Sequence, residues 1–275
     1  MQTKTYYKYA QDVIGGKVVS GKFIQLAAER FFSMMEDDRY EFKEKKADEV
    51  IEFFSILQHF TGRHAGKSFI LQPWQQFVIA AIYGFYIKET GERLVKYVYI
   101  EIARKNGKTA FAAGLSLYHL IADGEMDAEV DLAANSKEQA KIAFKFCSQF
   151  AKGIDPKGKD LVSYRDKVKF EKMLSLLQVF AADDSKLDGF NASMYLIDEY
   201  HAAKNTGLKD VLQSSQGMRD NPMAVIITTA GFDKLGPCYQ YREMCTEVLS
   251  GLKENDALFA GIFSPDEGDD WKDPQ

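Results

Sequence analysis

The sequence has few of the residues from which disulfide frameworks and zinc sites are built. Its 275 residues include three cysteines, Cys147, Cys238 and Cys245, and four histidines. An odd number of cysteines at spacings that match no zinc motif predicts reduced thiols with structural roles. The composition therefore argues against a small disulfide-stapled protein and against a zinc-finger module.

Long hydrophobic runs are also missing. No stretch approaches the roughly 18 consecutive apolar residues of a membrane span, and the start, MQTKTYYKYAQDV, lacks the apolar centre of a secretory signal. The sequence also contains no internal repeat and no low-complexity tract. We therefore expect a cytoplasmic protein that has no membrane partner.

What the chain does contain is enough apolar material for a large core. Hydrophobic residues make up 46% of it and charged residues 27%, which suits one large domain or two small ones. The net charge of −5 argues against a protein that coats nucleic acid over its whole surface. A local basic track remains compatible with this charge.

Hydrophobic spacing divides the chain into a helical first part and an alternating second part. Apolar residues recur every three or four positions behind Ser20, which we expect to cap a helix, again around Val50 to Leu57, and after Pro73. From Leu94 onward, strand-like runs alternate with helical segments; the runs are LVKYVYIEI, EVDLAA, LLQVFAA, MYLID and MAVIITT. This alternation predicts an α/β fold with a mostly parallel sheet and helices on both faces.

Two stretches end in glycine, lysine and a small hydroxyl residue, as phosphate-binding loops do: TGRHAGKSF, from Thr61 to Phe69, and IARKNGKTA, from Ile102 to Ala110. A phosphate loop must join a strand to a helix, because its backbone N–H groups and the helix N-terminus point at the anion. The first stretch follows a helix and runs into Pro73, so we interpret it as a surface turn. The second lies between a strand and a helix, and we assign it as the phosphate loop.

Within this loop Lys108 can reach the β and γ phosphates of a nucleotide, and the Thr109 hydroxyl can ligate Mg²⁺. The loop departs from the pattern G-x-x-x-x-G-K-[ST] at one position, since Ile102 stands where the first glycine is expected. Taken alone, the match therefore also fits a chance occurrence.

A second motif, MYLIDEYH, supplies the carboxylates that nucleotide hydrolysis needs. Asp198 falls at the end of a short apolar strand and suits a metal-side carboxylate, and Glu199 can orient and deprotonate the attacking water. The competing interpretation is that the pair only caps a helix. The distance of the pair along the chain from Lys108 leaves room for intervening strands of the same sheet, which favours the catalytic interpretation.

Three further residues agree in position with a nucleotide site. Thr228 and Thr229 end the strand MAVIITT, where their hydroxyls can sense a γ-phosphate, although threonine also simply favours strands. Gln75, in LQPWQQF, can pair with the donor and the acceptor of an adenine edge, or it can be a solvated surface residue.

Together these motifs resemble the ATPase domain of the large terminase subunit of tailed bacteriophages, the motor that packages double-stranded DNA into a procapsid. Almost the whole chain takes part in the resemblance. The matching segments are YAQDVIGGKVVSGKFIQLAAERFF, similar to the N-terminal helical segment, LQPWQQF, similar to the adenine-binding glutamine motif, IARKNGKT, similar to a deviant Walker A motif, DGFNASMYLIDEYH, similar to Walker B, and ITTAG, similar to the coupling motif.

The resemblance implies a RecA-like P-loop ATPase that uses ATP and Mg²⁺. It implies a helical subdomain or lid over residues 1–70, the ATPase core over 71–263 and an acidic linker over 264–275. By resemblance Arg104 touches the γ-phosphate beside Lys108, whereas on the residues alone it is equally a solvated charge. The implied catalytic residues are Glu199, Lys108 and Arg104, the implied metal ligands are Thr109 and Asp198, and the implied nucleotide contacts are Gln75, Arg104, Lys105, Asn106, Gly107, Lys108, Thr109, Thr228 and Thr229.

The resemblance also implies partners. They are double-stranded DNA, the small terminase subunit, the portal protein and further copies of the chain in a ring. An isolated chain can be a monomer. The implied location is the cytoplasm of a bacterial host. A neighbour in such a ring often supplies a second cation, for which Arg219, Arg165 and Lys186 are candidates. The basic segment AKGIDPKGKDLVSYRDKVKFEK can follow a DNA backbone or be a solvated insertion.

Large terminases continue into a nuclease domain, so we expect this chain to lack nuclease activity and to be an engineered or natural fragment. Two alternatives remain. One is a helicase-like translocase, which would need a second motor domain. The other is a nucleotide-binding assembly module that has little turnover of its own.

Overall fold

A twisted eight-stranded sheet forms the centre of the molecule. The computed structural model describes residues 4–181, 191–266 and 268–269. The strand order is β10-β3-β9-β8-β4-β7-β6-β5, and the first six strands are parallel, whereas β6 is antiparallel to both of its neighbours. The strands are β3 (Tyr97–Ile102), β4 (Glu129–Ala134), β5 (Leu161–Ser163), β6 (Lys167–Phe170), β7 (Ser175–Ala181), β8 (Met194–Asp198), β9 (Met223–Thr228) and β10 (Leu258–Phe263).

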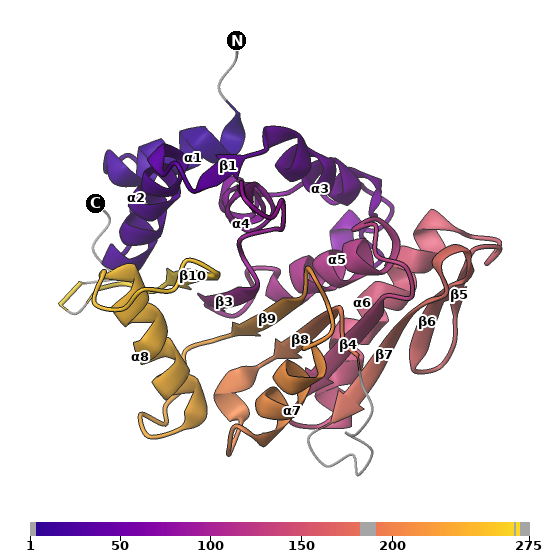
Figure 1. Cartoon of the computed structure of the whole chain (residues 1–275). Coiled ribbons are helices and arrows are strands. Elements are labelled where there is room, and N and C mark those ends of the chain that lie inside the picture. Colours follow the sequence, from indigo (N-terminus) through magenta and orange to yellow (C-terminus); the bar gives the residue numbers. More distant parts are fainter. Residues whose placement is uncertain (1–3, 182–190, 267, 270–275) are drawn as a thin grey trace.

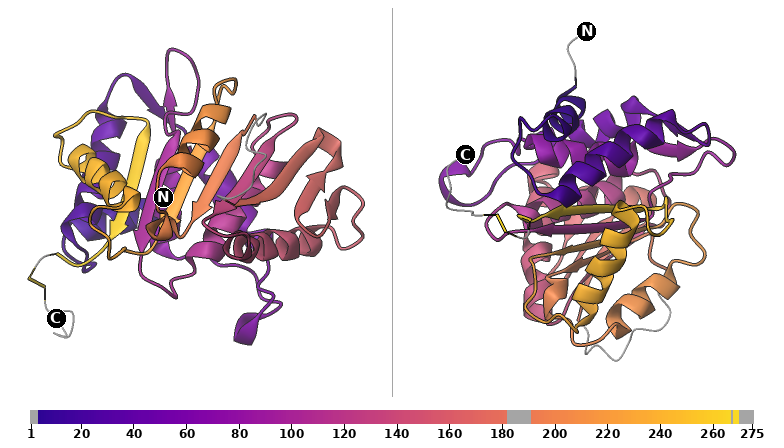
Figure 2. Two further views of the ribbon diagram at one scale, coloured as in Figure 1. Left: turned by 90° about the horizontal axis from the view of Figure 1, so that it is seen from below. Right: turned by 90° about the vertical axis from the view of Figure 1, so that its left-hand side faces the viewer.

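Helices cover both faces of this sheet, as Figures 1 and 2 show. On strand β9, Val225 and Ile227 join one hydrophobic cluster, and Ala224 and Ile226 join another on the opposite face. A strand buried on both faces becomes continuously apolar, which explains the run MAVIIT. The first face carries α5 (Lys108–Ile121) and α6 (Lys137–Ile154), and the second carries α7 (Gly207–Ser215) and α8 (Pro237–Leu249). These elements confirm the predicted α/β class.

Four N-terminal helices pack onto the first face and beside the β10 edge (Figure 1). They are α1 (Thr5–Ile14), α2 (Lys22–Glu36), α3 (Glu44–Ile56) and α4 (Pro73–Tyr83). A small antiparallel pair, β1 (Tyr40–Phe42) with β2 (Phe85–Ile87), crosses the expected boundary at residue 70. One hydrophobic cluster also contains residues from both sides of it. The hydrophobic core therefore continues across residue 70. The division of the chain into a helical subdomain and an ATPase core at this residue stays a prediction.

Two local predictions change in the structure, and a third is not tested by it. The residue before α2 is Gly21 rather than Ser20, and a side chain there would collide with the carbonyl oxygen of Ser264 at 2.0 Å. The basic segment after α6 is no simple loop, because it contains the β5–β6 hairpin. The expected acidic linker over 264–275 lies mostly outside the described residues.

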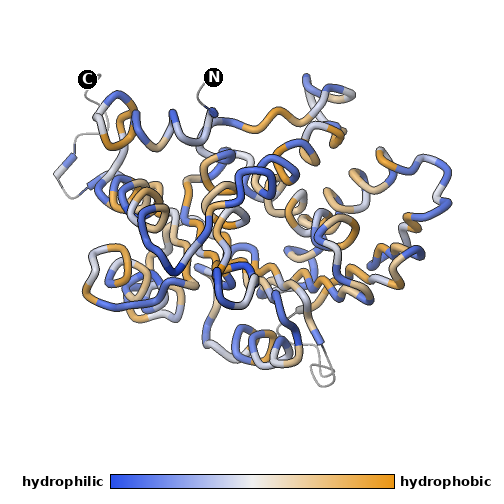
Figure 3. Tube along the Cα trace, turned by 45° about the horizontal axis from the view of Figure 1, so that its top comes forward, coloured by the Kyte–Doolittle hydropathy of each residue, from blue (hydrophilic) through white to orange (hydrophobic). Residues whose placement is uncertain are grey.

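Hydropathy follows this architecture. Figure 3 shows hydrophobic segments gathered toward the interior and hydrophilic segments in the peripheral loops. Within the described parts of the chain, no helix combines the length and the apolar character that crossing a membrane requires.

Candidate nucleotide site

The loop between β3 and α5 has the backbone geometry of an anion-binding loop. It begins after Ile102, and α5 starts at Lys108. Gly107 precedes the helix with φ of 74°, a left-handed conformation that glycine adopts without strain. The first N–H groups of α5 have no partner within the helix, so they are available to an anion.

The other Gly-Lys stretch has a different setting. Residues 61–68 are exposed and include the short 3₁₀ helix Gly62–His64, and Gln58 pairs with Ser68 to close the loop on itself. No helix starts at Lys67. As expected, this stretch is a surface loop.

Thr109 and Asp198 come together at the carboxyl edge of the sheet. Asp198 is the last residue of β8, and the Thr109 hydroxyl donates to its Oδ2 over 3.1 Å. Burial raises the pKa of the Asp198 carboxyl to about 6, an effect that the positive charge of Lys108 opposes. A carboxylate and a hydroxyl facing each other beside a phosphate loop fit Mg²⁺, which binds through one or two protein oxygens together with phosphates and water.

Glu199 forms an ion pair with Lys108 through Oε1. Its backbone has φ of 57°, which is uncommon for a residue other than glycine. Three backbone contacts hold this conformation: the Glu199 N–H donates to the carbonyl of Ile227 and to Oδ1 of Asp198, both over 2.9 Å, and the side-chain amide of Asn135 donates to the Glu199 carbonyl over 3.3 Å. Such local strain is frequent at functional sites.

His201 joins Glu199 to strand β9, and the sequence analysis did not identify it. Its Nδ1 lies 3.1 Å from Oε2 of Glu199, 3.1 Å from Oγ1 of Thr228 and 3.3 Å from Oγ1 of Thr229. The His201 backbone N–H also donates to Oγ1 of Thr228 over 3.0 Å. His201 therefore lies between Glu199 and the hydroxyls of Thr228 and Thr229. A lone histidine gives little signal in a sequence, but its position two residues after the carboxylate pair could have identified it.

Gln75 and Arg104 are placed differently from these residues. Gln75 is buried, and its Oε1 accepts a hydrogen bond from the backbone N–H of Gln72 over 2.8 Å. Its oxygen is therefore engaged in capping α4, and the proposed pairing with adenine stays a prediction. Arg104 is exposed in the loop, and its guanidinium forms no ion pair with the described residues.

The remaining loop residues lie between Arg104 and α5. Lys105 is exposed and has φ of 68°, and the Asn106 side chain donates to the carbonyl of Ala103 over 3.1 Å. Beside the loop lies a cavity of about 550 Å³. It is lined by Tyr9, Trp74, Ile102, Ala103, Asn106 and Phe263, among others.

Arg219, Arg165 and Lys186, the candidates for a cation that one subunit supplies to the nucleotide site of the next, have different surroundings. Arg219 pairs with Glu125 over 2.6 Å and donates to backbone carbonyls near the amino ends of β4 and β8, at the opposite edge of the sheet from the phosphate loop. Arg165 is exposed at the tip of the β5–β6 hairpin. Lys186 lies outside the described residues.

Comparison with known proteins agrees with this geometry. Residues 73–247, more than half of the chain, match the family model described as "Terminase large subunit, ATPase domain". The chain belongs to this family. The match extends from the start of α4 into α8 and thus includes the phosphate loop and the carboxylate pair of this terminase domain.

Individual relatives give the same result. The "Terminase, large subunit" of Enterobacteria phage HK97 is 26% identical over 191 residues, which cover 65% of this chain and 35% of the relative. "Protein YmfN" of Escherichia coli (strain K12) is 42% identical over 88 residues, 32% of this chain and 19% of that protein. The crystal structure of the HK97 bacteriophage large terminase shares the fold with a TM-score of 0.67 at 21% identity, over 82% of this chain and 45% of that one. The terminase domain thus spans less than half the length of these relatives.

Proposed function

We propose that this chain hydrolyses ATP and that hydrolysis drives the movement of double-stranded DNA in a phage packaging motor. The observation that carries the proposal is the convergence of Lys108, Thr109, Asp198 and Glu199 at the carboxyl ends of two strands. In open α/β sheets this edge is where ligands bind. Family membership supports the choice of ATP as the ligand.

In the proposed mechanism, the N–H groups at the start of α5 and the ammonium of Lys108 hold the β and γ phosphates. Thr109 and Asp198 hold Mg²⁺, which neutralises charge on the phosphoryl oxygens. When Lys108 turns to the phosphates, its ion pair with Glu199 opens, and Glu199 becomes free to orient the attacking water and take its proton. Arg104 stabilises the charge that develops on the γ-phosphate.

The nucleoside has a natural place in the cavity beside the phosphate loop. Its volume of about 550 Å³ is within the range of small-molecule sites. The aromatic rings of Tyr9, Trp74 and Phe263 line it and suit the faces of a base. Tyr9 comes from α1, so we assign the helical subdomain of residues 1–70 a lid-like role over the nucleotide.

We further propose that the working motor is a ring of these chains in the cytoplasm of a bacterial host, with the small terminase subunit and the portal protein as partners. One observation favours the alternative of an assembly module with little turnover. In the structure Lys108 and Glu199 form an ion pair with each other. An isolated chain can therefore have little ATPase activity until a neighbouring subunit or a partner protein favours the binding of nucleotide by Lys108.

Steady-state ATP hydrolysis by the purified chain over a wide concentration range tests the proposal. Lys108→Ala and Glu199→Gln should each lower kcat by at least about 100-fold, because a phosphate clamp and a general base each contribute on this scale. Glu199→Gln should bind ATP at least as tightly as wild type, since it removes the carboxylate that competes for Lys108.

Lys67→Ala, in the other Gly-Lys stretch, is the matched control and should hydrolyse ATP at the wild-type rate. Equal rates in wild type and Glu199→Gln would show that the base is misassigned. Binding of ATP without hydrolysis at any concentration would favour the assembly module.

A further inference from the structure

Helix α6 presents a row of lysines that the nucleotide site does not use. The row, called here the α6 lysine stripe, consists of Lys137, Lys141, Lys145 and Lys152. Three of the four are exposed and Lys141 is half-buried. Throughout the described part of the chain, no carboxylate lies within ion-pair distance of any of the four ammonium groups.

Helical geometry places the four lysines on one narrow strip. At 3.6 residues per turn, positions 137, 141, 145 and 152 fall within about a quarter of the helix circumference, and they extend over about 22 Å of its length. The buried side of α6, which adjoins the stripe and includes Ala143, Phe144 and Cys147, packs in the hydrophobic core with the sheet and α5. The stripe is therefore a fixed row on a helix that the core holds in place.

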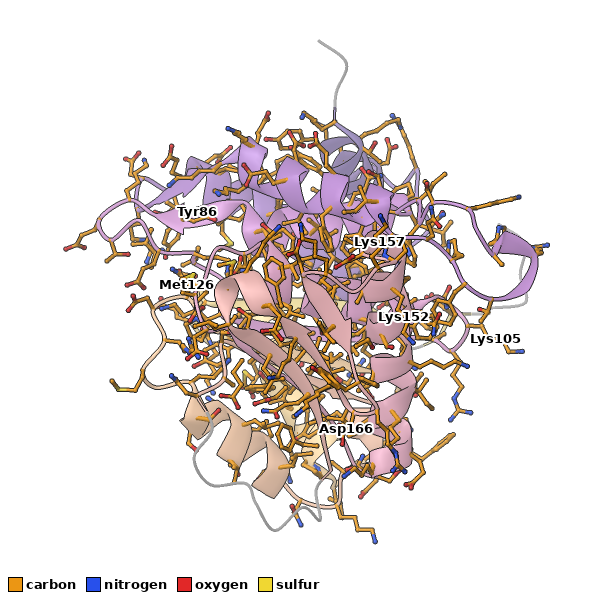
Figure 4. All side chains as sticks on the ribbon, turned by 90° about the vertical axis from the view of Figure 1, so that its right-hand side faces the viewer. Tyr86, Lys105, Met126, Lys152, Lys157 and Asp166 are labelled. Atoms are coloured by element: carbon orange, nitrogen blue, oxygen red, sulfur yellow. The ribbon has the colours of Figure 1, made fainter. Side chains whose placement is uncertain are left out.

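Further cations follow the stripe along the chain. Lys157 and Lys159 lie in an exposed turn directly after α6. Figure 4 shows Lys105 of the phosphate loop on the same side of the view as Lys152 and Lys157.

Little local negative charge balances these lysines. Residues 137–160 contain six lysines and three acidic residues, in a chain whose net charge is −5. Asp155 accepts hydrogen bonds from the backbone N–H groups of Asp160 and Leu161, and Asp160 pairs with Lys172. Like charges at i and i+4 destabilise a helix slightly. Repulsion between the neighbouring lysines thus destabilises α6 slightly. A bound polyanion would remove this repulsion by neutralising their charge.

We propose that the α6 lysine stripe binds the phosphate backbone of duplex DNA. The choice of DNA among polyanions rests on the proposed packaging function. Lysines act as point charges and do not read base edges in the way that bidentate side chains do, so the contact is expected to be independent of sequence. Duplex DNA carries one charge per about 1.7 Å of axis, so a row of about 22 Å can meet several phosphates.

The stripe is also connected to the catalytic residues. The residue before the N-cap of α6 is Asn135, whose side chain donates to the Glu199 carbonyl over 3.3 Å, and Ser136 caps the helix by accepting from Gln139 N–H over 3.3 Å. The segment that starts α6 is therefore hydrogen-bonded to the backbone of Glu199.

The test compares two fourfold variants. One neutralises the stripe with Lys→Gln at 137, 141, 145 and 152. The control neutralises Lys22, Lys45, Lys88 and Lys253, which are also exposed and form no ion pair with the described residues. Fluorescence anisotropy with a labelled duplex of about 30 base pairs is measured for the whole chain from about 50 to 200 mM salt, the range over which phosphate contacts weaken strongly.

The stripe variant should bind DNA at least about tenfold more weakly. Its plot of log K against log salt should be shallower by up to about 3.6, or about 0.9 for each phosphate that a lysine no longer neutralises. The control should match wild type within about twofold in Kd. Equal affinities of the two variants, or no DNA binding by wild type at low salt, would overturn the assignment. Intact DNA binding with altered self-association in sedimentation velocity would instead assign the stripe to a second copy of the chain and would also overturn it.

The outcome is separable from the proposed ATPase function. Lys108→Ala should bind DNA like wild type while failing to hydrolyse ATP, and the stripe variant should keep the basal ATPase rate measured without DNA. Loss of DNA binding in the stripe variant therefore supports the inference even where ATP hydrolysis is not observed.

Discussion

At the scale of single residues, the candidate nucleotide site consists of short contacts between side chains that lie at or just after the ends of separate strands. Lys108 follows β3, Glu199 follows β8, and Thr228 ends β9. His201 contacts both of the last two residues. In the proposed mechanism, His201 would orient Oε2 of Glu199, which has no hydrogen-bond partner among the described residues, once nucleotide withdraws Lys108.

His201→Ala should lower kcat for ATP by about 10- to 100-fold if its imidazole donates to the Glu199 carboxylate during hydrolysis, the equivalent of one hydrogen bond to a charged group. The KM for ATP should change by less than about threefold, because His201 does not touch the phosphate loop. His201→Asn, which keeps a polar group near the position of Nδ1, should recover part of the rate. His64→Ala, in the exposed surface loop, serves as the control; an equal loss of kcat in that variant, or a change confined to KM, would refute the orienting role.

At the scale of elements, packing between α3 and α5 depends on a glycine, Gly114, where any side chain would be in the way. A Cβ atom on Gly114, in the middle of α5, would lie 2.4 Å and 2.6 Å from ring carbons of Phe54, which is itself fully buried in α3. The glycine thus allows the two helices to approach, although glycine disfavours a helix interior.

Gly114→Ala should lower the free energy of unfolding by about 1–3 kcal/mol, because overpacking of the core exceeds the gain in helix propensity. Gly153→Ala in α6 is the matched control, since no atom lies within 4 Å of its added Cβ. It should stabilise the protein by about 0.5–1 kcal/mol. Urea denaturation measures both variants, and a stabilised Gly114→Ala would show that the ring of Phe54 can move aside.

The elements that the sequence predicted well are those with one strong local signal. MAVIIT and MYLID are apolar at every position except the last, and both form central strands. The hairpin of β5 and β6 escaped prediction because KVKF, the sequence of β6, alternates charged with apolar residues over only four positions, which locally resembles a solvated loop. The contacts of Asn135 with Glu199 and of His201 with Thr228 escaped because they join residues 64 and 27 positions apart in the chain, and no local pattern encodes such contacts.

At the scale of the whole molecule, the buried charge of Asp131 makes stability depend on pH. Asp131, in the middle of β4, is fully buried, and Gln178 Nε2 donates to its Oδ1 over 3.3 Å. Burial, assisted by the negative charge of Glu129, raises the pKa of Asp131 to about 8. The folded state therefore favours the protonated carboxyl, so this contribution to stability is full below the unfolded pKa near 3.9 and is lost as pH rises through about 8.

Asp131→Asn should remove this pH dependence. Between pH 6 and pH 9 the Tm of wild type should fall more than that of the variant, and at pH 9 the variant should be more stable by about 1 kcal/mol or more, since one pKa unit corresponds to about 1.4 kcal/mol. Asp220→Asn, at an exposed site, is the control. Parallel Tm curves for wild type and Asp131→Asn would contradict the raised pKa.

The position of β10 has a mechanical consequence. β10 lies at the edge of the sheet and pairs in parallel with β3 along its whole length, so that Phe263 stands opposite Ile102, the last residue of β3. Phe263 also packs against Trp74 at a centroid distance of 5.1 Å and lines the cavity beside the loop. Tension on the chain at Phe263 would load the hydrogen-bond ladder that fixes the start of the phosphate loop.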